Sequence, residues 1–142
     1  MIGIVVAYNP MKKGTKSMKV GITVWQNRIS PVFDVAKHVK VIRLDNNAVQ
    51  IKDLEMTSSL PLQRAELLSN AGIKVLICGA ISVPFAKMIA GRNIKVIPFI
   101  AGEFSTVLNA YLNSNLERPE FNMPGYRRQR RRRFHGGRPN GR

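Results

Sequence analysis

IKVLICGAISVPFAKMIAGRNIKVIPFI, residues 73–100, holds two apolar runs with a helical pattern between them. The first run, residues 73–78, is almost continuously apolar, which is typical of a strand covered on both faces. Ser82 can cap the segment that follows, and Gly91 can end it. Its apolar residues recur at the spacing of one helix face: Val83, Ala86, Ile89 and Ala90. With residues 94–100 as the next strand, this stretch predicts two parallel strands joined by a right-handed helical crossover.

Two further helices are expected on either side of this stretch. Residues 60–71 follow Ser58 and Ser59, either of which can cap a helix. They precede Gly72, which suits a left-handed residue at a helix end. Beyond the last strand, apolar residues recur at i, i+3, i+4, i+7 and i+8, as expected for a helix packed on a core. These residues are Phe104, Val107, Leu108, Tyr111 and Leu112.

The first half of the chain predicts strands only. Residues 19–25 and 38–44 carry the alternating, β-branched pattern of strands. Residues 48–54 are expected to return as the second arm of a hairpin across a turn at residues 45–47. The complete order is three strands, a helix, a strand, a helix, a strand and a helix. This order predicts an α/β domain in which helices cover a mixed five-stranded sheet.

Charge separates the end of the chain from the rest. The formal net charge is +15, from 23 basic and 8 acidic residues. Residues 118–142 hold nine arginines and one acidic residue, which gives +8 (9 − 1) and leaves +7 (15 − 8) for the remainder. Prolines, glycines and arginines replace aliphatic residues there, so too little apolar surface remains to offset the entropy of ordering. We expect one domain at residues 18–117, an extension or leader at residues 1–17, and a disordered arginine-rich tail at residues 118–142.

Cysteine usage and hydropathy predict a cellular compartment. Cys78 is the single cysteine, which excludes a disulfide within the chain and fits a reducing environment. No apolar run approaches the roughly 18 residues that a membrane-spanning helix needs. The apolar start of the chain lacks preceding basic residues and a small-residue cleavage site. We therefore expect a cytoplasmic protein that does not bind membranes.

Three motifs resemble those of the dinitrogenase iron-molybdenum cofactor biosynthesis family. They are NRISPVFDVAK at residues 27–37, LICGAIS at residues 76–82 and VIPFIAGEFSTVLNAYL at residues 96–112. The resemblance extends over residues 18–116, with the motifs in the family's order and spacing. It implies a ribonuclease H-like fold of five strands in a small protein that carries metal-sulfur clusters or their precursors, molybdenum- and iron-containing ones included. The implied partners are proteins that donate and accept the cluster.

One position departs from the nitrogenase-associated branch of this family. In that branch a histidine precedes the phenylalanine of the first loop and is a suspected cluster ligand. Here Val32 precedes Phe33, and valine cannot coordinate a metal. The sequence Ser-Pro-Val-Phe-Asp at residues 30–34 resembles instead the branch outside nitrogenase assembly. This departure argues against the nitrogenase cofactor itself and leaves a related inorganic cluster open.

The first loop offers candidate contacts for an anionic cluster. Arg28 and the loop amides could face the anion, while Pro31 fixes the chain and biases Ser30 toward extended geometry. A local structural role is the alternative. In that role Ser30 would cap a turn, Asp34 would accept hydrogen bonds from backbone amides, and Phe33 would fill the core.

The segment Cys78-Gly79 ends a predicted parallel strand directly before a helix. Ligands of open α/β sheets gather at the carboxyl ends of strands, where helix amides favour an anion and lower the pKa of a thiol. This makes Cys78 the candidate metal ligand, and Gly102 could supply further amides. The alternatives are a small core residue for Cys78 and a tight turn for Gly102. The predicted cluster-binding residues are Arg28, Ser30, Cys78, Gly79 and Gly102.

No conventional catalytic or zinc pattern is present in the sequence. His38 and His135 form no close-spaced cluster with Cys78. Nucleases on ribonuclease H-like folds place carboxylates around paired divalent ions, beginning on the first strand, but residues 19–25 contain none. We therefore expect no enzymatic activity and a cluster held by charge, amides and shape, with at most one thiolate.

The arginine run supports an alternative function. Six residues of this run are arginines: Arg127, Arg128, Arg130, Arg131, Arg132 and Arg133. Such a run attracts phosphate whatever the fold, and the flanking Tyr126 and Phe134 could stack on bases. Nucleic acid bound in this way would be held in a salt-sensitive manner, with little dependence on base sequence. A solvated tail, or a contact for an acidic protein partner, is open beside it.

Overall fold

The computed structural model describes residues 18–45 and 48–124 of the 142-residue chain. Its strands are β1 (Met18–Trp25), β2 (Arg28–Ile29), β3 (His38–Asp45), β4 (Ala48–Glu55), β5 (Ile73–Ile77) and β6 (Lys95–Ile97). Its helices are α1 (Pro61–Asn70), α2 (Val83–Ala90) and α3 (Phe104–Leu112), with short 3-10 turns η1 (Phe33–Val35) and η2 (Pro119–Phe121). The three predicted helices and five predicted strands are confirmed in their predicted order.

A mixed sheet in the order β4-β3-β1-β5-β6 forms the centre of the domain. β1 pairs antiparallel with β3 and parallel with β5, and β5 pairs parallel with β6. The two crossovers from β4 to β5 and from β5 to β6 contain α1 and α2, as the alternating second half of the sequence requires. The predicted α/β class and ribonuclease H-like fold are confirmed. The two-residue strand β2, which pairs with β1 beside the main path, was not predicted.

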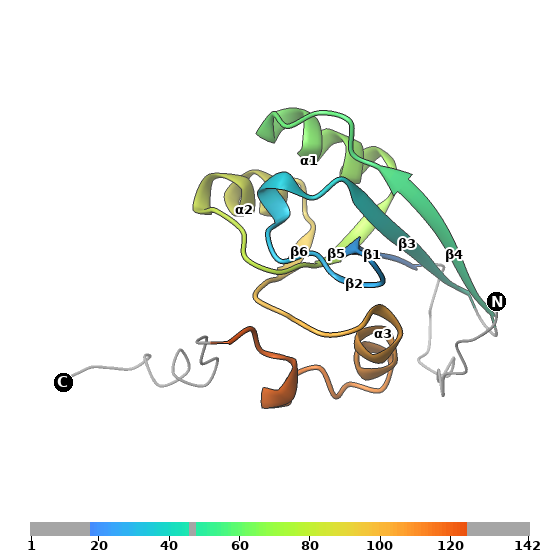
Figure 1. The fold of residues 1–142 in the computed structure, drawn as a ribbon. Helices are drawn as coiled ribbons and strands as arrows, with labels where there is room; N and C mark the ends of the chain where they lie inside the picture. Colours follow the sequence, from blue (N-terminus) through green and yellow to red (C-terminus); the bar gives the residue numbers. More distant parts are fainter. Residues whose placement is uncertain (1–17, 46–47, 125–142) are drawn as a thin grey trace, which may run out of the picture.

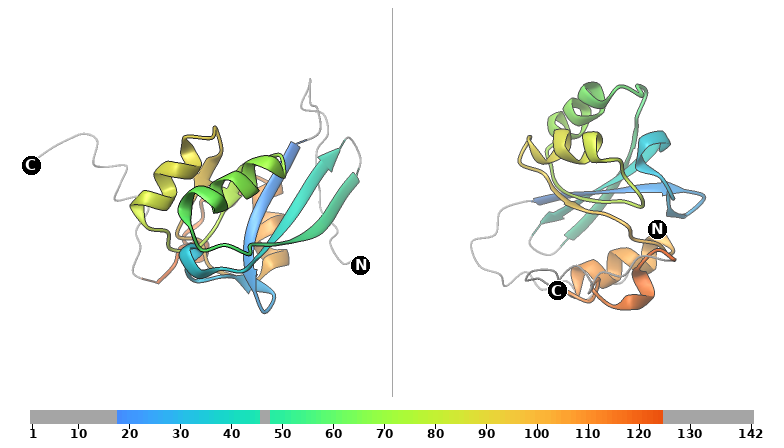
Figure 2. Two further views of the ribbon diagram at one scale, coloured as in Figure 1. Left: turned by 90° about the horizontal axis from the view of Figure 1, so that it is seen from above. Right: turned by 90° about the vertical axis from the view of Figure 1, so that its left-hand side faces the viewer.

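Helices cover both faces of this sheet (Figure 1). Figure 2 shows α1 and α2 on one face and α3 with the segment after it on the other. Each layer has its own buried apolar cluster, one built around Phe104, Val107 and Leu108 and the other around Phe33, Leu68 and Ile89. The longest of these helices has ten residues, and no helix in the described part of the chain is long and apolar enough to cross a bilayer.

The expected helix caps differ from the observed ones. α1 begins at Pro61 without a side-chain cap, because the Ser58 hydroxyl accepts a hydrogen bond from the Leu60 N–H at 3.0 Å, outside the helix. Ser82 is the N-cap residue of α2, but its side chain makes no capping hydrogen bond. Gly72 adopts the predicted left-handed conformation, with φ of +84°.

The last strand is shorter than expected. Residues 94–100 were predicted as one strand, but β6 contains only Lys95–Ile97. Pro98 follows it and has no N–H to donate to a neighbouring strand. Phe99 then turns the chain with φ of +62°. The rest of this segment therefore forms a loop at the carboxyl end of the sheet.

The boundary of the predicted tail is also corrected. Residues 118–142 were expected to be disordered, but residues 118–124 pack on the domain through η2. Phe121 is buried in the same apolar cluster as α3, and its carbonyl oxygen accepts a hydrogen bond of 2.8 Å from the Ala101 N–H. The average composition of residues 118–142 hid this contact, because the apolar surface that packs on the domain comes from Phe121. Residues 1–17, residues 46–47 of the predicted turn and the arginine run at 127–133 lie outside the described residues.

Candidate functional site

The carboxyl ends of β1, β5 and β6 meet at one edge of the sheet, because these three strands are parallel. The loops that follow them are residues 26–37, 78–82 and 98–103, and we call this region the loop junction. The Phe33 N–H donates to the Ala80 carbonyl oxygen at 2.7 Å, and the Ala80 N–H donates to the Pro31 carbonyl oxygen at 2.8 Å. The first and second loops are therefore joined through their backbones.

The third loop closes the junction from the other side. The Ile29 N–H donates to the Gly102 carbonyl oxygen at 2.9 Å, and the Phe104 N–H donates to the Asn27 carbonyl oxygen at the same distance. A further bond of 2.9 Å runs from the Phe99 N–H to the Gly79 carbonyl oxygen. All three loops thus converge, as the sequence predicted. The Phe99, Ile100 and Ala101 N–H groups of the third loop donate to carbonyl oxygens and are therefore not available to a ligand. The contribution of the Gly102 amide to anion binding stays a prediction.

Gly79 is the point of closest approach between two of these loops. A Cβ atom at this position would lie 2.5 Å from the carbonyl oxygens of both Ser30 and Pro31. No side chain fits in that space. Gly79 thus serves the junction through close backbone packing. Gly102 has φ of +137°, so its role also follows from its backbone conformation.

Cys78 was predicted as a metal ligand, and its position contradicts that prediction. Its side chain is fully buried in the apolar cluster beneath α1 and α2. Burial, reinforced by the negative charge of Asp34, raises the pKa of the thiol from 9.0 to about 12. A metal binds the thiolate, which is scarcely populated near neutral pH when the thiol pKa is so high. The alternative reading of Cys78 as a small core residue is the correct one.

Asp34 of the first loop and Arg64 of α1 make hydrogen bonds that hold this loop against the two helices α1 and α2. The Asp34 carboxylate accepts a hydrogen bond of 3.1 Å from the Ser82 N–H at the start of α2, which confirms its predicted bond to a backbone amide. Arg64 of α1 is almost fully buried, and its Nη1 donates to the Phe33 carbonyl oxygen at 3.2 Å. Its guanidinium carbon lies 5.5 Å from the centre of the Phe33 ring. Burial lowers the pKa of Arg64, and Asp34 opposes this shift.

An open groove of about 460 Å³ lies beside the first loop, and we call it the first-loop groove. Its volume is within the range of ligand-binding clefts. The lining residues are Val24, Trp25, Ser30, Pro31, Val32, Val35, Ala36, Lys37 and His38. The ionisable residues among them are Lys37 and His38, and no carboxylate lines the groove. The groove therefore combines apolar walls with groups that favour an anion.

The structure separates the predicted site residues into four groups. Ser30 lines the first-loop groove, while Cys78 is in the core. Gly79 and Gly102 hold the loop junction together. Arg28 lies outside the groove lining, on β2 opposite Trp25.

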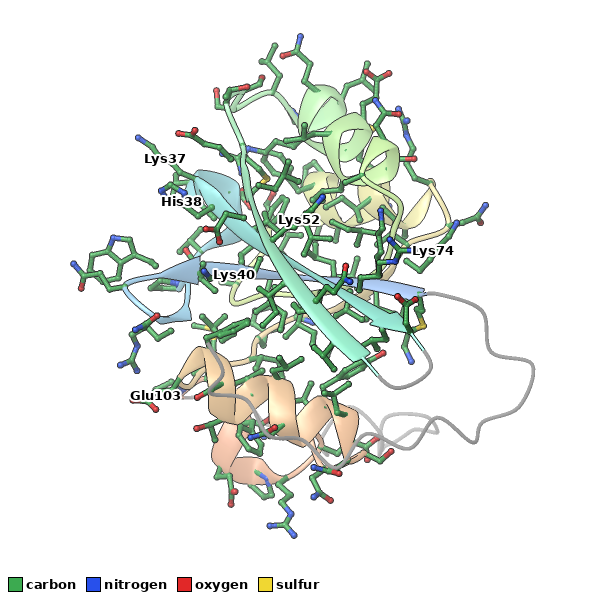
Figure 3. All side chains as sticks on the ribbon, turned by 90° about the vertical axis from the view of Figure 1, so that its right-hand side faces the viewer. Lys37, His38, Lys40, Lys52, Lys74 and Glu103 are labelled. Carbon is green, nitrogen blue, oxygen red and sulfur yellow. The ribbon has the colours of Figure 1, made fainter. Side chains whose placement is uncertain are left out.

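Lys37 and His38 were not predicted as site residues. Figure 3 shows both at one margin of the molecule, where β3 begins. The signal that could have identified them is the pairing of β1 with β3, because Val24 at the end of β1 is opposite His38. Because β3 runs antiparallel to β1, the first residues of β3 lie beside the carboxyl end of β1.

Comparison with known proteins assigns the family. The sequence profile of the dinitrogenase iron-molybdenum cofactor family matches residues 16–114, which is more than half of the chain. The chain belongs to this family. Among curated proteins, none matches the chain in sequence.

Several solved structures have a fold similar to that of this chain. The protein PH0822 has a TM-score of 0.63 and 16% identity, with 70% of this chain and 93% of that chain covered. MJ0327 from Methanocaldococcus jannaschii has a TM-score of 0.57 and 19% identity, covering 72% and 94%. The apo form of the orange protein from Desulfovibrio gigas has a TM-score of 0.58 and 14% identity, covering 76% and 98%. At such identities the likeness concerns the fold alone.

Replacing Gly79 with alanine should destabilise the fold. The added methyl group meets two carbonyl oxygens that are fixed by the loop junction, so we expect a loss of about 1–3 kcal/mol in the free energy of unfolding. Urea denaturation measures this loss. Gly91→Ala is the matched control, because Gly91 has a φ of −65° and its Cβ would contact Lys87 at an ordinary 3.4 Å. Equal effects of the two substitutions would contradict the close approach at Gly79.

The Cys78 thiol should be inert in the folded protein. A rise in pKa from 9.0 to about 12 removes nearly all thiolate at pH 8, and burial also blocks access of a reagent. Reaction with a chromogenic disulfide at pH 8 should be at least about a hundredfold slower in the folded protein than in urea. Rapid modification of the native thiol would show that Cys78 is accessible and would restore it as a candidate ligand.

Proposed function

We propose that this protein binds and carries an anionic metal-sulfur cluster of the molybdenum or iron type, or a precursor of one, without catalysing a reaction of its own. The family supports the general role of cluster handling. The observation that carries the proposal for this chain is the first-loop groove, which has basic and apolar lining and no carboxylate. Its position at the carboxyl end of β1 is where α/β proteins bind ligands.

The lining of the groove suits a sulfide-rich anion. The Lys37 ammonium group neutralises negative charge, and the Ser30 hydroxyl can donate a hydrogen bond to a sulfide. The His38 imidazole can coordinate iron, copper or molybdenum through a ring nitrogen. The apolar walls formed by Val24 and Trp25 limit access of water to the bound cargo.

Weak coordination is consistent with carriage. In the described part of the chain, no group of three or more His, Cys, Asp or Glu side chains could hold a metal ion. The cluster would thus be held by one imidazole together with charge and shape. A cargo with few protein ligands can be released to an acceptor, whereas a structural metal with a closed ligand set is retained.

Uptake of thiomolybdate tests this function. Metal-free protein mixed without oxygen with tetrathiomolybdate, alone or with iron or copper, should retain molybdenum after desalting and show new visible absorption. Lys37→Ala and His38→Ala should each weaken the affinity about tenfold or more, because each removes a contact worth about 1.4 kcal/mol. Titration followed by absorption and metal analysis measures both effects.

Two substitutions serve as controls for this titration. Lys74→Ala removes a positive charge at the opposite margin of the molecule in Figure 3, and Cys78→Ala removes the buried thiol. Both variants should bind the cluster as the unmodified protein does. Protein that takes up no molybdenum, iron or copper under any of these conditions would refute the proposed function. An equal loss of affinity in Lys74→Ala would show that total charge, rather than the first-loop groove, attracts the anion.

A further inference from the structure

Large apolar side chains are exposed around the first-loop groove. Trp25 is 53% exposed, Val32 39% and Val35 68%, and all three line this one groove. Single exposed apolar residues are ordinary on protein surfaces, but several around one groove offer apolar contacts to a partner. These three residues surround the groove on the side open to solvent.

The backbone of Trp25 is fixed by strand pairing and by a tight turn. It ends β1 and pairs directly with Arg28 across a two-residue turn, in which Gln26 and Asn27 have φ of +53° and +65°. The Asn27 carbonyl oxygen accepts the hydrogen bond from the Phe104 N–H, which ties this turn to the start of α3. A tryptophan fixed in this way loses little backbone entropy when a partner covers it.

Cations and carboxylates both lie near this apolar group. Lys37 lines the groove, and Arg28 is opposite Trp25 on the paired strand. Glu103 is bridged to Arg28 from the other side, and Glu55 is opposite His38. Within residues 18–45 and 48–124, neither Arg28 nor Lys37 forms an ion pair with a carboxylate. These cations are therefore available to carboxylates of another molecule.

We propose that Trp25, Arg28, Val32, Val35 and Lys37 form a docking surface for a partner protein that presents an apolar recess bordered by carboxylates. Tryptophan and arginine are the residue types most enriched among the energetically dominant residues of protein interfaces. The aliphatic side chains favour a protein over a nucleic acid, because base stacking requires a series of flat aromatic rings and this surface has one. The inference rests on the proposed function, in which the partner is the protein that donates or accepts the cluster.

Docking at this surface has a direct consequence for transfer. The partner would cover the open side of the first-loop groove, so the cluster would pass between the two proteins without crossing bulk water.

A pair of synthetic peptides tests the docking surface. The first has a central Trp-Leu pair flanked by aspartates, and the second has Gly-Ser in place of Trp-Leu. Both will be attracted by the net charge of +15, so the difference between their affinities isolates the apolar contact. For the metal-free full chain we expect the Trp-Leu peptide to bind about tenfold more tightly. This difference should disappear in Trp25→Ala, and Arg28→Glu should weaken both peptides.

Two control variants and an NMR map of the peptide-binding surface complete this experiment. Leu62→Ala truncates an apolar residue of α1 that is 49% exposed, and it should retain the difference between the peptides. Lys74→Glu should weaken both peptides less than Arg28→Glu does. In NMR titrations of the unmodified protein, the Trp-Leu peptide should shift the Trp25 indole signal and the amide signals of residues 26–37.

Three outcomes would overturn the docking surface. They are a peptide difference that persists in Trp25→Ala, signal shifts confined to other faces, and a stronger response of the Trp25 indole to single-stranded oligothymidylate than to the Trp-Leu peptide. Because the titrations use metal-free protein, they are independent of cluster uptake. Peptide binding without cluster uptake would refute the proposed function alone, and cluster uptake without peptide binding would refute the docking surface alone.

Discussion

The backbone contact between Gly79 and the first loop is the constraint on which the site depends. The second loop can approach Ser30 and Pro31 closely only because residue 79 has no side chain. That approach allows the paired hydrogen bonds between Pro31, Phe33 and Ala80, and these bonds set the position of the first loop. The first-loop groove is formed by the other side of this same loop. A shift of the Gly79 contact would therefore change the groove without altering any of its lining residues.

The loop junction also determines how the site can attract an anion. The amides of Phe33, Ala80 and Phe99 bond to carbonyl oxygens of neighbouring loops, so they are not available to an anion, and Lys37 supplies positive charge at the groove. A buried guanidinium, Arg64, supports the first loop through the Phe33 carbonyl oxygen. Burying a charged group without full compensation is costly, and the Nε of Arg64 has no hydrogen-bond partner within the described part of the chain. The contacts of Arg64 with the Phe33 carbonyl oxygen and ring offset part of this cost and hold η1 against α1.

Periodicity in the sequence was sufficient to predict the helices, the main strands and the α/β class, and the family resemblance implied the ribonuclease H-like fold. The site, in contrast, depended on contacts between distant residues. The three helices and five main strands follow from local patterns that repeat over several turns or pleats. The pairing of Trp25 with Arg28 and the burial of Phe121 depend on neighbours remote in the chain, so β2 and η2 were missed. The residues next to Cys78 in the sequence do not distinguish a core thiol from an exposed one. His38 was recognised as a strand residue, but its place beside the groove required the register between β1 and β3.

The hydrogen bonds among the three loops should make them one rigid unit before any ligand binds. Hydrogen exchange of the amides of Phe33, Ala80 and Phe104, followed by NMR in metal-free protein, tests this rigidity. Because each of these amides donates to a carbonyl oxygen in another segment of the chain, we predict protection close to that of the paired strands β1 and β5. Exchange at the rates of unstructured peptide would show that the loops move independently and would contradict the account.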